Sequence, residues 1–156
     1  MQKVVITGMG AVSALGLDVA SNLAAMHAAR CGIRPISQFD PAATGVHVAG
    51  EVPGFDASTR IAKKLSKRLD RFTQFALYSA IEAAAQAQLT AVADRSRLAV
   101  IYESGIGGLS TIQTQVTKMD AKGAGRISPL FVPMAIINMA PGVLAQYFEA
   151  HGESYA

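Results

Sequence analysis

A short apolar run that breaks into glycines, at residues 98–109, most constrains the fold. The run Leu-Ala-Val-Ile-Tyr is rich in β-branched and aromatic side chains, which is typical of a buried strand. Gly105, Gly107 and Gly108 then allow a tight turn or a close backbone approach around Ile106. Two interpretations remain open: Ile106 is the floor of an apolar pocket, or it is an ordinary core residue in a strand-to-helix turn.

Composition limits the class of protein. The 156 residues predict one domain, and 51% are hydrophobic but only 16% charged, against about 25% in an average domain. We therefore expect much of the surface to be covered by a partner or by the rest of a larger domain. No apolar run is long enough for a membrane span, and no secretory signal is expected. The single cysteine, Cys31, fits a reducing cytoplasm. His27, His47 and His151 lack metal-ligand spacing.

The N-terminal segment, residues 3–10, is predicted to be a strand that ends in a glycine turn. Its Val-Ile-Thr-Gly-x-Gly sequence suggests a dinucleotide site, but the third glycine of that motif should stand at residue 13, which is Ser13. Nucleotide binding is therefore the weaker interpretation. Asp18 or Ser21 is expected to cap a helix that ends near Ala29.

A basic stripe follows between residues 60 and 71. Its cations recur at helical spacing and are Arg60, Lys63, Lys64, Lys67, Arg68 and Arg71. A helix starting at Ser58 or Thr59 would place all six on one face. This stretch carries a net charge of +5, and the rest of the chain carries −2. A solvated helix face is one interpretation. Mutual repulsion of like charges favours the other, docking of an anionic partner. Without interleaved aromatic residues, an acidic protein fits better than nucleic acid or a membrane.

The second half alternates helices with irregular segments. Helices are expected at residues 72–89, with a face of small residues, at 109–119 and at 140–151, and a new strand at 153–156. Residues 127–139 are unusually apolar for a segment that contains Pro129 and Pro133, which forbid one long helix. A subunit interface or the wall of a substrate tunnel would cover those side chains.

Five motifs together resemble one family, in order and over nearly the whole chain. They are Val-Val-Ile-Thr-Gly-Met-Gly at 4–10, Cys-Gly-Ile at 31–33, Ser-Gly-Ile-Gly-Gly at 104–108, Ile-Ser-Pro-Leu-Phe-Val-Pro at 127–133 and Asn-Met-Ala at 138–140. They resemble the N-terminal part of the β-ketoacyl-acyl carrier protein synthases, most closely the elongating enzymes of bacterial type II systems.

The resemblance implies an α/β fold of the thiolase-like αβαβα type, of which residues 1–156 would form most of the first half. It implies an acyltransferase that joins an acyl-enzyme thioester to malonyl-acyl carrier protein by decarboxylative Claisen condensation, with no cofactor. The family's nucleophilic cysteine and two histidines would lie beyond residue 156. No catalytic residue is therefore assigned within this chain, and Cys31 matches a structural position.

The resemblance also assigns two sets of binding residues. Gly105 and Ile106, with Phe131 and Val132 from across a homodimer interface, would line the acyl pocket. Lys64, Lys67 and Arg68, taken together with the adjacent Lys63 of the stripe, would dock acyl carrier protein. The implied partners are acyl carrier protein, malonyl and acyl thioesters and a second copy of the chain, in the cytoplasm. The alternative is a non-catalytic module that binds the carrier protein or pairs with a synthase.

Overall fold

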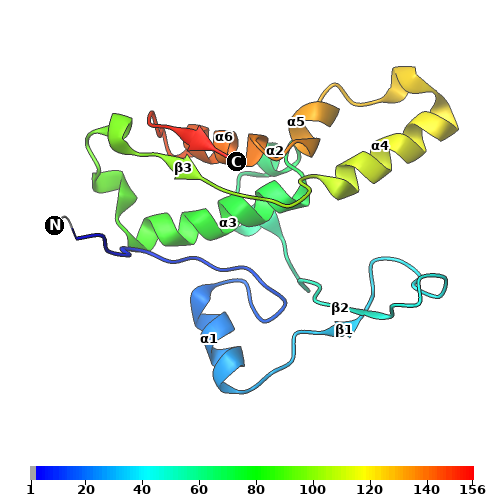
Figure 1. Cartoon of the computed structure of the whole chain (residues 1–156), viewed down its shortest axis with the longest axis horizontal. Coiled ribbons are helices and arrows are strands. Elements are labelled where there is room, and N and C mark those ends of the chain that lie inside the picture. The colour runs from blue at the N-terminus through cyan, green and yellow to red at the C-terminus, as the bar shows by residue number, and fades with distance from the viewer. Residues whose placement is uncertain (1–2) are drawn as a thin grey trace.

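The computed structural model describes residues 3–156 and is centred on one helix, α3 (Arg71–Gln86). In Figure 1 this helix runs through the middle of the molecule, with residues 139–155 on one side and residues 19–49 on the other. Asp70 caps it, because the carboxylate accepts a hydrogen bond from the Phe72 amide at 3.2 Å. The predicted helix at 72–89 is therefore confirmed, with a slightly earlier end.

The other elements are shorter than α3. In chain order they are α1 (Val19–His27), β1 (Arg34–Pro35), β2 (Val48–Ala49), η1 (Ala57–Thr59), α2 (Lys63–Ser66), η2 (Leu89–Ala91), η3 (Arg95–Arg97), β3 (Val100–Ile101), α4 (Leu109–Lys122), η4 (Ala124–Arg126), α5 (Phe131–Ala135), α6 (Met139–Tyr147) and β4 (Ser154–Tyr155). No helix in residues 3–156 is long and apolar enough to cross a membrane.

The core lies between α3, α6 and the segment before α2. Ile61, Leu77 and Leu144 are buried there, and Leu77 is fully enclosed. Phe55 adds an aromatic cluster, with its ring 4.6 Å from that of Phe75 and 5.1 Å from that of Tyr78 in edge-to-face geometry. These contacts fix α3 against its neighbours on more than one side.

The strands form two small sheets. β1 and β2 are antiparallel, and β3 and β4 are parallel, with Val100 opposite Ser154 and Ile101 opposite Tyr155. The predicted strand at 153–156 is confirmed, and α6 contacts both β3 and β4. The prediction that the 98–102 strand is buried is wrong for Ile101, which is 71% exposed, because β4 is the one strand paired with β3 in the described chain.

The expected strand at residues 3–10 is not formed. The segment runs beside α3 (Figure 1), and side chains of that helix accept hydrogen bonds from backbone amides at its end. Gln86 accepts from the Met9 amide at 2.7 Å, and Glu82 accepts from the amide of the next residue but one, Ala11, at 3.3 Å. A Cβ at Gly10 would lie 1.9 Å from the Ser79 carbonyl oxygen. The glycines of the suspected nucleotide motif therefore permit close packing on the small-residue face of α3.

The single helix expected from Ser58 or Thr59 is also wrong. The chain forms η1, then α2, and then starts α3 afresh, with extended backbone at Ala62 (ψ 130°) and at Asp70 (ψ 161°). One physical reason is that Asp70 stabilises more as the cap of a new helix than within a continuous one. Another is that a continuous helix would align six cations. Gln74 closes the gap by donating to the carbonyl oxygens of Ser66 and Leu69.

The later helices follow the predictions with shifted ends. α4 extends to Lys122 rather than residue 119, and α6 ends at Tyr147 rather than 151, before Glu149, whose φ is +53°. The prolines divide residues 127–139 as expected, into a turn and the five-residue α5. Pro141 is fully buried in the first turn of α6, where its missing amide costs nothing.

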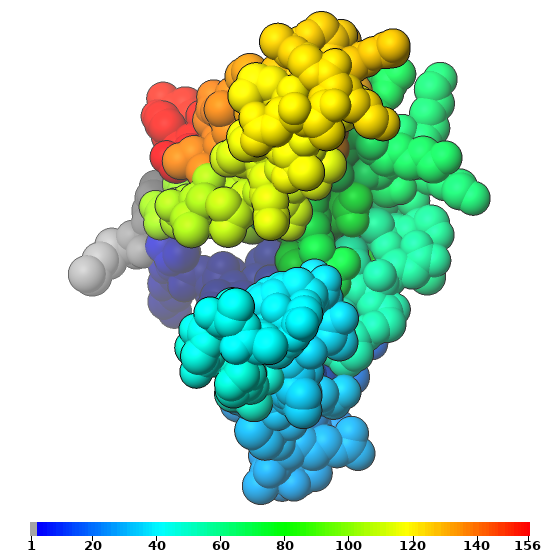
Figure 2. All heavy atoms as spheres, turned by 90° about the vertical axis from the view of Figure 1, so that its right-hand side faces the viewer, coloured from blue at the N-terminus to red at the C-terminus, as the bar shows by residue number. Residues whose placement is uncertain are grey.

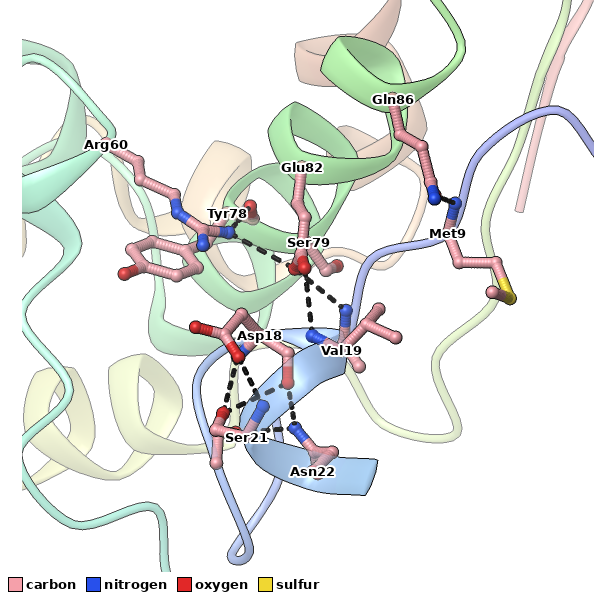
Figure 3. A network of polar contacts seen from close by, with 12 residues as sticks. Met9, Asp18, Val19, Ser21, Asn22, Arg60, Tyr78, Ser79, Glu82 and Gln86 are labelled. Atoms are coloured by element: carbon pink, nitrogen blue, oxygen red, sulfur yellow. Dashed lines mark hydrogen bonds and ion pairs between the residues drawn. The ribbon is translucent and has the colours of Figure 1, made fainter. Parts of the chain in front are cut away.

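The start of α1 provides a stability test. Figure 3 shows Asp18 and Ser21 exchanging hydrogen bonds in a capping box, while Glu82 of α3 accepts from the Val19 amide at 2.8 Å. The Ser21 hydroxyl and amide lower the pKa of Asp18 below its ordinary value of 3.8. A depressed pKa contributes stability above the ordinary value, and this contribution disappears as pH falls through the folded-state pKa.

We therefore expect Asp18→Ala to lower the free energy of unfolding by about 1 kcal/mol at pH 7, with a smaller difference below pH about 3.5. Urea unfolding at both pH values measures this. Asp120→Ala is the control, because Asp120 is exposed and its carboxylate makes no hydrogen bond within residues 3–156. A loss for Asp18→Ala that is the same at both pH values would contradict the assignment.

Candidate functional site

The six cations of the basic stripe fall into two groups with different environments. Arg60 lies 4.2 Å over the Tyr78 ring and pairs with Glu82 at 3.4 Å. Arg71 lies over the Phe55 and Phe75 rings and donates to the Val52 carbonyl at 3.2 Å. Both are partly buried, so these two arginines stabilise the fold rather than form a free surface.

The other four cations form a group that we call the basic cluster: Lys63, Lys64, Lys67 and Arg68. All four are exposed, on α2 and on the turn that leads to Asp70. Within residues 3–156 the Arg60–Glu82 pair is the one salt bridge, so the cluster has no carboxylate within pairing distance. Four unneutralised charges this close together produce a positive surface suited to an anionic partner.

The carboxylate of Asp70, directly after this turn, connects the starts of two helices. We call this connection the joint. One oxygen accepts from the Phe72 amide at the start of α3. The other accepts from the Thr111 amide at 3.0 Å and the Thr111 hydroxyl at 2.5 Å, at the start of α4. Asp70 and Thr111 are both buried, with 5% and 8% exposure. The negative charge thus lies between two helix N-termini, whose partial positive charges and donors stabilise it.

Residues 104–108, the glycine turn, lead into α4 and depend on this joint. Gly108 is the N-cap of α4 and offers no side chain, so Asp70 supplies the cap through Thr111. A Cβ on Gly108 would lie 3.1 Å from the nearer Asp70 oxygen, 2.4 Å from the Met134 carbonyl oxygen and 2.9 Å from the Ala135 Cα. The turn is therefore confined between Asp70 and α5, and Gly107 adopts a φ of +82° there.

The same joint brings α5 into position. The Gly108 amide donates to the Ala135 carbonyl at 2.9 Å, which fixes the end of α5 against the turn. Phe131 and Val132 lie at the other end of this helix, Phe131 partly buried and Val132 57% exposed. The glycine turn and α5, both predicted as functional from the sequence, thus meet at Gly108, and the basic cluster ends two residues before Asp70, which holds the start of α4.

The residues predicted to line an acyl pocket are open. Ile106 is 64% exposed, and a Cβ on Gly105 would meet nothing within 4 Å. Neither residue, nor Phe131 or Val132, lines any of three cavities found in the described chain. In Figure 2 the yellow-green segment that contains the glycine turn borders a hollow above the β1–β2 hairpin, which is cyan. The role of Ile106 stays a prediction, and a pocket there needs a further covering surface.

Two of these cavities lie at opposite ends of α3. One, of about 590 Å³, lies at the C-terminal ends of α3 and α6, where Arg95 and Tyr147 contribute to its wall, and contains none of the predicted site residues. Another, of about 290 Å³, lies beside the joint and is lined by Asp70, Ser110 and Thr111 among others. Within residues 3–156 no group of three or more His, Cys, Asp or Glu side chains could hold a metal, and Cys31 is an exposed thiol.

The contact between Asp70 and Thr111 was not predicted from the sequence. In the sequence Asp70 is notable only as the one acid within the basic stripe, and nothing marks Thr111. A local signal existed, because an aspartate before a helical pattern is a typical N-cap. The partner could not be found that way, since Thr111 is 41 positions away and lies within another helix.

Solved structures identify the architecture. The chain superimposes on the ishigamide ketosynthase/chain length factor with a TM-score of 0.83 and 29% identity, over 96% of this chain and 38% of that one. A β-ketoacyl synthase from Burkholderia phymatum STM815 gives a TM-score of 0.80 at 24% identity, over 97% and 38%, which supports the fold alone. The fold is therefore that of the N-terminal part of thiolase-like ketosynthases, as predicted.

Sequence comparison identifies the family. The model for the beta-ketoacyl synthase N-terminal domain matches residues 1–156, so the chain belongs to the β-ketoacyl synthase family. The 3-oxoacyl-[acyl-carrier-protein] synthase 2 of Staphylococcus aureus (strain COL) is 40% identical over 99% of this chain and 38% of its own length. The synthase 2 of Synechocystis sp. is 36% identical over 97% and 36%. The chain thus spans little more than a third of these relatives.

The tight approach at Gly108 makes a structural prediction. Gly108→Ala should lower the free energy of unfolding by about 1–3 kcal/mol, because the new methyl group overlaps backbone atoms that cannot move aside cheaply. Gly105→Ala is the matched control in the same turn, and should change it by less than about 0.5 kcal/mol. Denaturant unfolding of both variants measures the difference. Equal stability of the two would show that the turn is not confined as described.

Proposed function

We propose that this chain is the N-terminal domain of an elongating β-ketoacyl-acyl carrier protein synthase, which condenses an acyl-enzyme with malonyl-acyl carrier protein in fatty acid or polyketide synthesis. In this proposal the domain supplies no catalytic residue. It supplies the carrier-docking surface and part of the acyl pocket. The observation that carries the proposal is that Asp70, two residues after the basic cluster, holds the start of α4, where the glycine turn packs against α5.

Carrier docking is supported by the division of the stripe. The cations with aromatic or acidic partners within the chain turn inward, and the four that remain exposed are those assigned to docking. A solved ketosynthase, AntDE, which shares the fold at a TM-score of 0.72 and 17% identity, is described in complex with an acyl-carrier protein. An acidic carrier protein would gain from the cluster both attraction and a faster encounter rate.

Charge reversal tests the docking surface. Lys64→Glu, Lys67→Glu and Arg68→Glu together should weaken binding of an acidic acyl carrier protein at least about 100-fold at low salt, since attraction becomes repulsion. The affinity of the native protein should also fall as salt rises. The control reverses Arg30, Arg34 and Arg97, which are exposed on other elements and give the same change in net charge. Equal weakening by both triple variants would contradict a local docking site.

The pocket role of Ile106 rests on its position. It stands on a turn held on two sides, yet its side chain is 64% exposed toward open space that another surface can enclose. A large apolar side chain held rigidly at the end of a cavity limits the length of chain that fits.

Ile106→Phe should therefore lower kcat/KM of the complete synthase for a long acyl-carrier substrate by about tenfold or more, and leave a short one nearly unchanged, because the ring occupies the end of the pocket. Condensation rates with carriers loaded with two chain lengths measure this. Val46→Phe, at an exposed position of the β1–β2 region, should leave the ratio as it is. An unchanged ratio for Ile106→Phe would remove the residue from the pocket.

We infer that the synthase acts as a homodimer in the cytoplasm. Val132 near the start of α5, and Ile136 and Ile137 just after its end, are exposed apolar residues that a second copy could cover. The second candidate function is a non-catalytic carrier-binding or pairing module, which the exposed basic cluster favours. Carrier binding by the protein without transfer of the acyl group to it would support that module.

A further inference from the structure

The structure points to a positioning role for Asp70 that the proposed function does not include. We propose that the Asp70–Thr111 contact holds the glycine turn, and with it Ile106, at a fixed position relative to the basic cluster, so that one side chain links the carrier-docking surface to the selection of acyl-chain length. This inference rests on the proposed function and adds a residue that acts through the turn.

The basic cluster is connected to Asp70 by a very short stretch of chain. Asp70 follows Arg68 after one residue, Leu69, which is buried in the core. The backbone from the basic cluster to Asp70 is short and anchored, with the Leu69 amide donating to the Ser66 carbonyl and Gln74 donating to the Leu69 carbonyl. A displacement of the cluster therefore cannot be absorbed before it reaches the carboxylate.

The contact between Asp70 and Thr111 is rigid. The buried carboxylate accepts three hydrogen bonds, two of them from Thr111, and no cation lies within pairing distance in residues 3–156. Losing Thr111 would leave one carboxylate oxygen buried without a donor, which is costly. The contact therefore resists separation of the α3 and α4 starts.

The Asp70–Thr111 contact also sets the position of the glycine turn. Thr111 is three residues beyond Gly108, inside the first turn of α4, so its position sets the direction in which α4 begins. Gly108 is wedged between the Asp70 carboxylate and α5, and the Gly107 amide donates to the Ser104 hydroxyl at 3.0 Å. The turn has little freedom of its own, and Ile106 takes the position that Asp70 and α5 impose.

Asp70→Asn separates the two functions of the carboxylate. Asparagine remains a good N-cap for α3 through its oxygen, but its NH2 group then faces the Thr111 backbone amide, which can only donate, while the Thr111 hydroxyl can turn to accept. Thr111→Val removes one donor from the other side, and Thr111→Ser keeps both. Asp18→Ala serves as the control for general destabilisation, because it removes the cap of α1, far from the site.

The experiment compares kcat/KM of the complete synthase for a long and a short acyl-carrier substrate, together with carrier affinity. The measured quantity is the ratio of kcat/KM for the long substrate to kcat/KM for the short one. We expect Asp70→Asn and Thr111→Val to shift this ratio toward one by about fivefold, as for one lost hydrogen bond. Thr111→Ser should retain the native ratio. Carrier affinity should stay within about twofold for all variants. An unchanged ratio in both Asp70→Asn and Thr111→Val, or an equal shift in Asp18→Ala, would overturn the inference.

Hydrogen exchange tests the positioning without any substrate, and so separates its failure from failure of the proposed function. Asp70→Asn should speed amide exchange at residues 107–112 at least about fivefold, while residues 63–68 exchange as in the native protein. Unchanged exchange at 107–112 would overturn the positioning role. If exchange changes as expected but the native protein neither binds carrier nor condenses acyl groups, the proposed function is wrong and the link to chain length fails with it.

Discussion

The buried carboxylate of Asp70 is the interaction on which the rest of the structure depends. Its oxygens cap two helices at once, α3 through Phe72 and α4 through Thr111, and no other side chain among residues 3–156 caps the start of α4. A charge at this depth is tolerated because two helix N-termini and three donors surround it. Removing it would loosen the start of α4 relative to α3, and the glycine turn would then be held from the side of α5 alone.

The same helix α3 organises the N-terminal half by a related device. Glu82 accepts from the Ala11 and Val19 amides and pairs with Arg60, while Gln86 accepts from Met9. Polar side chains on one face of α3 thus substitute for strand partners, and the small residues between them let Gly8 and Gly10 approach the helix closely. The apolar residues of the segment remain outside, and Val4 is 96% exposed. Their surface is suited to further packing.

The division of the basic stripe connects stability with function. An arginine can stack on an aromatic ring and donate to carbonyls, and Arg60 and Arg71 do both. The lysines and Arg68 lie on α2 and on the turn after it, have no such partners within residues 3–156, and keep their charges in solvent. Burial therefore separates the two inward arginines from the four exposed cations proposed for docking. The basic cluster also ends two residues before Asp70, whose contact with Thr111 holds the glycine turn.

The sequence alone determined the local features of this protein: the Asp18 cap, the α3 helix, the proline break before α6 and the set of charged and glycine-rich motifs that mark the family. These depend on neighbouring residues, whose spacing is visible in the chain. Tertiary structure decided which residues act together. Asp70 and Thr111 meet across 41 positions, residues 3–10 pair with side chains instead of a strand, and aromatic rings divide one stripe into two groups. Such outcomes depend on packing between distant segments, which periodicity and propensity do not encode.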